Sequence, residues 1–168
     1  YRKYLAMKQA IPFHLQVKEN KPYTSAIAMK YGWMWQIPLQ DRIGAGYVFD
    51  SDYIDAAQAQ KEVEDFLGHK IDVKRSINFE AGRHEQYWVD NCMAVGLAAC
   101  FIEPLESTSI HLTVLQLQLL RQFANNLFDG TNDMFNEIIT NTMDEILSFV
   151  YLHYITKRKD TEFWKRFN

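Results

Sequence analysis

Glu106 is the side chain whose type and position could most directly support chemistry. It stands in residues 101–110, where Phe-Ile-Glu-Pro-Leu-Glu-Ser-Thr-Ser-Ile is typical of a loop that leads into a helix. Ser107 and Thr108 are residue types that begin helices, and the free N–H groups of a first helical turn can bind an anion. A carboxylate here can accept a proton, but it also complements the dipole at a helix start. The pattern alone favours this second interpretation of Glu106.

Two pairs of aromatic residues could contact a flat ligand. Residues 32–38 read Gly-Trp-Met-Trp-Gln-Ile-Pro, so a strand there would present Trp33 and Trp35 on one face. Such indoles can line a binding site, although core packing is the better interpretation of the pattern by itself. Phe163 and Trp164, near the C-terminal end of the sequence, could simply anchor a last helix.

Common catalytic and metal-binding motifs are absent from the sequence. The five histidines show no metal-ligand spacing, so no metal site is expected. No P-loop and no G-x-S-x-G nucleophile elbow is present, and residues 44–46, Gly-Ala-Gly, lack the third glycine of a dinucleotide-binding loop. Cys92 and Cys100 lie in apolar surroundings and are expected to be buried free thiols, which indicates a reducing compartment such as the cytoplasm.

The composition is that of one ordinary globular domain. The chain has 168 residues, of which 48% are hydrophobic, 14% aromatic and 23% charged. It carries 18 Lys and Arg against 21 Asp and Glu, a formal charge of −3, and no basic stripe. A nucleic-acid partner is therefore not expected. The apolar runs are far shorter than a membrane span, so no membrane partner is expected either.

The first part of the chain is expected to be rich in strands. Residues 1–22 should be irregular because Pro12 and Pro22 interrupt them. Residues 23–49 are strand-like and predict a hairpin-like pair with a long connection. Apolar residues at every second position are expected to share one face of a strand; they are Ile27, Met29, Tyr31, Trp33, Trp35 and Ile37.

A helix is expected over residues 52–67. Asp50 or Ser51 can cap its start, and Gly68 is placed to end it. Two more strands are expected at residues 71–79 and 87–89, with a turn at residues 81–83.

The last part of the chain is expected to be helical. One helix should run from residues 107–108 to about 128, and Thr131 can cap a second long one. Their predicted apolar stripes are Val114, Leu117, Leu120 and Leu127 for the first, and Phe135, Ile138, Ile139, Ile146, Phe149 and Val150 for the second. Asp160 or Thr161 can cap a final turn. The predicted class is therefore α+β, with strands of a mixed sheet in residues 1–100 and a helical region in residues 101–168.

Several ordered segments resemble those of one enzyme family, among them residues 22–29 and 42–49, which flank the first motif named below. Trp33-x-Trp35-x-Ile37-Pro38 resembles the W-x-W-x-I-P motif of the flavin-dependent halogenases, the tryptophan and indole halogenase family. Residues 103–108, Glu-Pro-Leu-Glu-Ser-Thr, are similar to another motif of that family, and Asp160-Thr161-x-Phe163-Trp164 resembles its C-terminal aromatic motif. The resemblance covers residues 20–168 in the family's order, and it implies a larger flavin monooxygenase-like fold with a helical substrate side.

The resemblance implies electrophilic halogenation of an electron-rich, indole-like aromatic substrate. Reduced FAD, O2 and a halide ion would supply hypohalous acid, and Glu106 would orient it and accept the proton lost from the ring. Backbone N–H groups of Thr108 and Ser109 would hold the halide, although the family usually has glycine in place of Ser109. Ser107, Phe163 and Trp164 would contact the substrate.

The resemblance also implies partners and a missing part. A separate flavin reductase would supply FADH2, and a homodimer is compatible with the family. The family's flavin-binding part, with its catalytic lysine, has no counterpart in these residues, so we expect the chain to belong to a longer protein. Two alternatives stay open at this point: a flavin monooxygenase that hydroxylates an aromatic, and a non-catalytic helical binding fragment.

Overall fold

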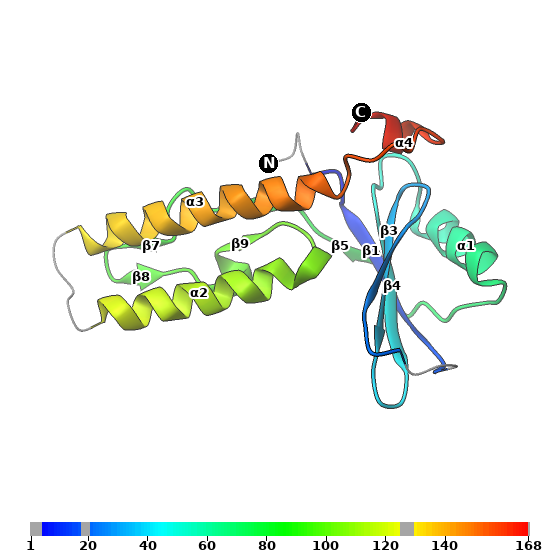
Figure 1. The fold of residues 1–168 in the computed structure, drawn as a ribbon, viewed down its shortest axis with the longest axis horizontal. Coiled ribbons are helices and arrows are strands. Elements are labelled where there is room, and N and C mark those ends of the chain that lie inside the picture. The colour runs from blue at the N-terminus through cyan, green and yellow to red at the C-terminus, as the bar shows by residue number, and fades with distance from the viewer. Residues whose placement is uncertain (1–4, 18–20, 125–129, 168) are drawn as a thin grey trace. The chain divides into compact units, whose positions relative to one another are not determined.

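A computed structural model describes residues 5–17, 21–124 and 130–167 (Figure 1). Strands and helices form an α+β fold, which confirms the predicted class. The chain divides into two compact units. We call residues 6–79 and 155–167 the sheet unit, and residues 5 and 80–154 the helical unit. The order of strands and helices in the sequence predicted a sheet-rich part over residues 1–100 and a helical part over residues 101–168. That division into domains stays a prediction.

The sheet unit is built on a five-stranded sheet. Its strands are β1 (Gln9–Leu15), β2 (Ser25–Ala28), β3 (Gly32–Pro38), β4 (Ile43–Phe49) and β5 (Ile77–Asn78). Their order in space is β2-β3-β4-β1-β5, and neighbouring strands run antiparallel. The predicted pair within residues 23–49 is confirmed, but its connection is a short turn in which the Leu39 N–H donates to the Arg42 carbonyl at 2.8 Å.

Pro12 lies inside β1, so the prediction of an irregular N-terminal stretch was wrong. β1 pairs with β4 over its whole length but with β5 only at Gln9 and Ala10. Beyond Ala10, one side of β1 has no strand partner among the described residues. A proline, which lacks an N–H, is tolerated on such an open side because no ladder hydrogen bond is lost.

The apolar residues at every second position lie on two strands rather than one. A tight turn, in which the Met29 N–H donates to the Gly32 carbonyl at 2.8 Å, joins β2 to β3. Ile27 lies opposite Met34, and opposite residues in an antiparallel pair share a face. Ile27 is therefore on the face of Met34 and not on that of Trp33. Only Trp33, Trp35 and Ile37 share the predicted face.

Helix α1 (Ala56–Leu67) covers one face of the sheet (Figure 1). The core between them comprises buried apolar residues, among them Ile11, Phe13, Met34, Tyr47, Phe49, Ala59 and Val63. The predicted end of the helix is confirmed, since Gly68 caps it with φ 74°. The predicted start was wrong: Asp55 caps α1 in a capping box with Gln58, whereas Asp50 is fully buried and accepts from Arg166 at 2.8 Å.

Glu64 fastens the segment after α1 to the helix, and this contact predicts a loss of stability in acid. Its carboxylate accepts from Lys70 Nζ at 2.7 Å, Gln60 Nε2 at 3.0 Å and the Ile71 N–H at 3.2 Å. These hydrogen bonds, that of Lys70 foremost, lower the pKa of Glu64 to about 2. The pKa in the unfolded chain is about 4.3. The stabilisation is therefore complete above pH ~4.3 and is lost as the pH falls towards 2.

We expect the melting temperature of the Glu64→Gln variant to fall less between pH ~4.3 and ~2 than that of the wild type. Thermal unfolding at a series of pH values measures this. Asp160, whose pKa the Arg158 guanidinium lowers to about 2, contributes in the same range, so Asp160→Asn is the companion variant. Equal slopes for wild type and Glu64→Gln would contradict the prediction.

The helical unit contains short strands and two long helices. The strands are β6 (Gly82–Arg83), paired with β9 (Cys100–Phe101), and β7 (Trp88–Val89), paired with β8 (Cys92–Met93). The helices are α2 (Thr108–Phe123) and α3 (Thr131–Leu152), which lie side by side (Figure 1). The turn expected at residues 81–83 is thus part of β6, and of the strand expected at residues 71–79 only β5 forms.

The buried stripe of α2 differs from the predicted one. Leu112, Gln116 and Leu119 are buried, whereas Val114 and Leu117 are 47% and 53% exposed. Gln116 can be buried because its side chain accepts from the Gly96 N–H at 3.0 Å and donates to the Ala94 carbonyl at 3.3 Å. Leu127 lies outside the described residues. In α3, Phe135, Ile139 and Val150 are buried as predicted, but Phe149 is 46% exposed.

Candidate functional site

The loop before α2 presents Glu106 at the surface of the helical unit. Glu106 and Ser107 both have φ 54°, a left-handed conformation that is uncommon for residues other than glycine. The Ser107 N–H donates to the Pro104 carbonyl at 3.3 Å, and the Thr108 N–H donates to the Leu105 carbonyl. The buried side chain of Leu105 anchors the loop in the core of the helical unit, while the next residue, Glu106, is exposed.

Glu106 lines a shallow cleft of about 460 Å³. The other lining residues are Thr108 and His111 from α2, and Glu145, Ile146 and Phe149 from α3. The Phe149 ring meets the His153 ring edge to face, with centroids 4.8 Å apart. The cleft thus combines a carboxylate with an aromatic and aliphatic wall, which suits a flat organic ligand.

The predicted halide donors, Thr108 and Ser109, begin α2. Thr108 is 8% exposed, and its N–H already donates to the Leu105 carbonyl. The half-buried Ser109 uses its carbonyl to accept from Thr113 Oγ1 at 2.8 Å. A halide at the Thr108 N–H would compete with the Leu105 carbonyl, so the halide site stays a prediction.

Glu103 and Tyr154 hold the start of this loop, and no sequence pattern indicated a role for either residue. Glu103 is fully buried, and the Tyr154 hydroxyl lies 2.8 Å from its Oε1 and 2.9 Å from its Oε2. Tyr154 directly follows the His153 cap of α3 and is 51 positions away in sequence. The only local signal for this pair is the first glutamate of the Glu-Pro-Leu-Glu segment.

The motif residues Trp33, Trp35, Ile37 and Pro38 all lie on β3. The indoles of Trp33 and Trp35 are tilted by 59° with centroids 6.1 Å apart, on the sheet face opposite the Met34 core. Trp35 lies opposite Gly46, and its ring covers the place where a Cβ of residue 46 would be. The buried Trp33 Nε1 has no hydrogen-bond partner among the described residues.

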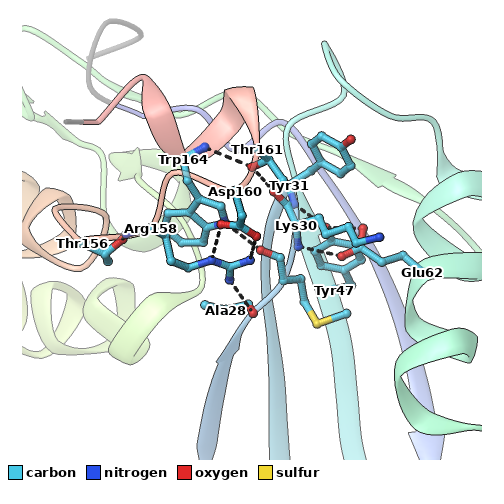
Figure 2. A network of polar contacts seen from close by, with 11 residues as sticks. Ala28, Lys30, Tyr31, Tyr47, Glu62, Thr156, Arg158, Asp160, Thr161 and Trp164 are labelled. Atoms are coloured by element: carbon cyan, nitrogen blue, oxygen red, sulfur yellow. Dashed lines mark hydrogen bonds and ion pairs between the residues drawn. The ribbon is translucent and has the colours of Figure 1, made fainter.

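Phe163 and Trp164 lie on the short helix α4 (Glu162–Lys165), capped by Thr161 as predicted. Phe163 is fully buried and Trp164 is 2% exposed. The Trp164 Nε1–H donates to the Met29 carbonyl at 2.8 Å, and the Arg158 guanidinium lies 4.9 Å from its ring centroid (Figure 2). These contacts support the interpretation that the pair anchors the last helix, and a substrate contact stays a prediction.

The turn that leads into β3 is held by a network of side chains (Figure 2). Arg158, Trp164 and Thr161 donate to three consecutive carbonyls, those of Ala28, Met29 and Lys30 respectively. On the other side, the Lys30 N–H donates to Glu62 at 2.7 Å, and the Tyr31 N–H donates to the Tyr47 hydroxyl at 3.1 Å. Burial raises the pKa of Glu62 and of Tyr47. Because its polar groups bond one another, this network fixes the turn.

The described residues contain neither a metal-binding cluster nor a phosphate-binding loop at Gly44–Gly46. No group of three or more His, Cys, Asp or Glu in that part of the chain could hold a metal ion. Gly44, Ala45 and Gly46 lie within β4 and pair on both sides, so they form no phosphate-binding loop.

Both cysteines are free, as predicted. The predicted burial of Cys92 was wrong, because Cys92 lies on β8 and is exposed. Burial raises the pKa of Cys100 to about 11. No helix in the described ranges is long and apolar enough to cross a membrane.

The predicted site residues fall into two groups. The helical unit brings together Glu106, Ser107, Thr108 and Ser109, and the sheet unit holds Trp33, Trp35, Ile37, Pro38, Phe163 and Trp164. Within the sheet unit, the bond from Trp164 to Met29 joins the C-terminal pair to the turn that begins the motif strand.

Comparison with known sequences finds relatives that share this whole segment. The tryptophan halogenase family model matches residues 1–168. The tryptophan 6-halogenase SttH of Streptomyces toxytricini is 38% identical over 165 residues, which are 95% of this chain and 32% of SttH. The tryptophan 7-halogenase RebH of Lentzea aerocolonigenes is 35% identical over 95% of this chain and 31% of RebH. The chain thus spans about a third of the length of the relatives that it matches.

Solved structures of halogenases have the same fold as this chain. The crystal structure of SttH matches with a TM-score of 0.92 and 34% identity, over 100% of this chain and 35% of that chain. BrvH, a flavin-dependent halogenase from Brevundimonas sp. BAL3, matches with a TM-score of 0.89 and 33% identity, over 99% of this chain and 35% of its own. The fold is therefore that of a segment of the flavin-dependent halogenases. The chain belongs to the tryptophan halogenase family, which confirms the family that its motifs indicated.

Proposed function

We propose that the protein that carries this chain is a flavin-dependent halogenase acting on an electron-rich aromatic compound such as an indole. The observation that carries the proposal is the exposed Glu106 carboxylate at an aromatic-walled cleft, in a chain of the tryptophan halogenase family. A buried or salt-bridged carboxylate would favour a structural role instead. Among the described residues, Glu106 forms no ion pair, and its exposed carboxylate can face a substrate.

Glu106 has two roles in the proposed reaction. Its carboxylate orients hypohalous acid. The halogen forms a bond to a ring carbon as its bond to oxygen breaks, and the departing hydroxide becomes water by taking up a proton, which the ring proton accepted by Glu106 balances. The ring is then a cation, which a nearby carboxylate stabilises. Glu106 accepts the proton from that carbon, and the ring regains its aromaticity. Ser107, Phe163 and Trp164 are the proposed substrate contacts, and the N–H groups of Thr108 and Ser109 the proposed halide donors.

Gly44, Ala45 and Gly46 form no phosphate-binding loop for a flavin, because they pair within β4. Reduced FAD, with O2 and halide, supplies the hypohalous acid, and we place its binding site outside these 168 residues. A separate flavin reductase is the proposed source of FADH2, and the cytoplasm is the proposed location.

Product analysis tests the proposal. The complete protein is incubated with FAD, a flavin reductase and its nicotinamide donor, O2, indole, and either chloride or bromide. We expect a product whose mass spectrum shows the isotope doublet of the halogen supplied. A hydroxylated product without halogen would contradict the proposal and favour the flavin monooxygenase alternative, and the absence of both products would favour the non-catalytic fragment.

A further inference from the structure

A fully buried carboxylate lies three residues before Glu106. Glu103 is 0% exposed and Tyr154 is 2% exposed, so their contact is shielded from water. The single Tyr154 O–H lies within hydrogen-bond distance of both carboxyl oxygens, at 2.8 and 2.9 Å. A carboxylate is costly to remove from water unless its oxygens accept hydrogen bonds. The position therefore requires a donor, and Tyr154 supplies one from the end of α3.

The loop that follows Glu103 is strained. Glu106 and Ser107 are consecutive non-glycine residues with φ 54°, a left-handed conformation that is unfavourable for residues with a Cβ. Such a conformation persists only when the surroundings fix it at both ends. At one end Ser107 and Thr108 bond back to Pro104 and Leu105 as α2 begins. At the other end, before Pro104, the segment is held by the contact between Glu103 and Tyr154.

We propose that Glu103, held by Tyr154, is a positioning residue for Glu106. The hydrogen bond ties the first residue of the loop to the end of α3, and α3 also supplies Glu145 and Phe149 to the cleft that Glu106 lines. The same helix thereby sets both the wall of the cleft and the base of the loop. A buried apolar residue would fill the space at less cost, but it would not fix a direction. The inference rests on the proposed function, which makes Glu106 the group that acts on the substrate.

Three variants of the complete protein test the inference. Tyr154→Phe removes the Tyr154 hydroxyl donor, Glu103→Leu removes the acceptor, and Glu103→Gln keeps one acceptor oxygen. We expect Tyr154→Phe and Glu103→Leu to lower the kcat for halogenated product by about 10–100-fold, as a displacement of about 1 Å does, with KM little changed. Glu103→Gln should lose less than Glu103→Leu. In the same proteins, the Ser107 and Thr108 amides should exchange hydrogen faster than in the wild type.

Gln116→Met is the matched control, because it disturbs another buried polar contact of the helical unit, on α2. It should lower the melting temperature without lowering kcat. The inference is overturned if kcat is unchanged in Tyr154→Phe, if Gln116→Met lowers kcat equally, or if Ser107 and Thr108 exchange at the wild-type rate in Tyr154→Phe. Should Glu103→Leu fail to fold, Tyr154→Phe and Glu103→Gln still decide. Absence of halogenated product from the wild type would contradict the proposed function. Amide exchange would still test whether the Glu103–Tyr154 hydrogen bond holds the loop.

Discussion

Glu106→Gln is expected to reduce the rate of halogenated product formation by about 10²–10⁴-fold while the oxidation of reduced flavin continues. Glutamine keeps the size of the side chain and a hydrogen-bonding oxygen, but it cannot accept the ring proton. Glu106 is exposed on a loop fixed by Leu105 and Glu103, so the substitution should leave the fold intact. The loss should therefore lie in kcat and not in stability.

Two measurements separate the loss of halogenation from the continued oxidation of reduced flavin. Halogenated product is counted by mass spectrometry, and O2 consumption is followed in the same reaction. Glu137→Gln is the matched control, since Glu137 is an exposed glutamate on α3 that does not line the cleft. A Glu106→Gln variant with the product yield of the wild type would rule out the assigned role, and so would an equal loss in Glu137→Gln.

Local signals predicted the elements whose ends are decided by neighbouring residues. Gly68 ends α1 because the left-handed cap suits glycine, and Thr161 caps α4 by accepting from the Trp164 N–H at 3.3 Å. The sequence was misleading where a distant strand decides the outcome. Pro12 was predicted to interrupt the chain, yet β1 forms because β4 pairs with it on one side and leaves the other side largely open.

The candidate site was predictable only in part for the same reason. The position of Glu106 before a helix follows from the loop and cap residues beside it. The burial of Gln116 could not be inferred from α2 alone, because its partners Ala94 and Gly96 lie about 20 residues earlier in the chain. Likewise, no periodic pattern joins Glu103 to Tyr154. A polar residue is predicted to face water until the fold supplies a partner for it.

Gly32→Ala is expected to destabilise the sheet unit by about 3 kcal/mol or more, at the upper end of what an added methyl group costs. Gly32 begins β3 opposite Phe49, and a Cβ at this position would collide with the Val48 carbonyl oxygen and approach the Phe49 Cα to 2.9 Å. Both are backbone atoms of β4, so no rotation of a side chain relieves the collision. The two strands would have to separate where the motif strand starts.

The neighbouring glycines of β4 provide a graded comparison, measured by thermal and urea unfolding with tryptophan fluorescence. At Gly44 a Cβ would meet only Leu39 Cδ1 at 3.8 Å and the Ile37 carbonyl oxygen at 3.9 Å, so Gly44→Ala should change stability by less than about 1 kcal/mol. At Gly46 it would meet the indole of Trp35, which can move, so Gly46→Ala should cost an intermediate amount and shift the fluorescence. If Gly32→Ala were as stable as Gly44→Ala, the close approach of β3 and β4 at Gly32 would be wrong. The register of β3 against β4 depends on that approach, because Gly32 is the residue at which the pairing of the two strands begins.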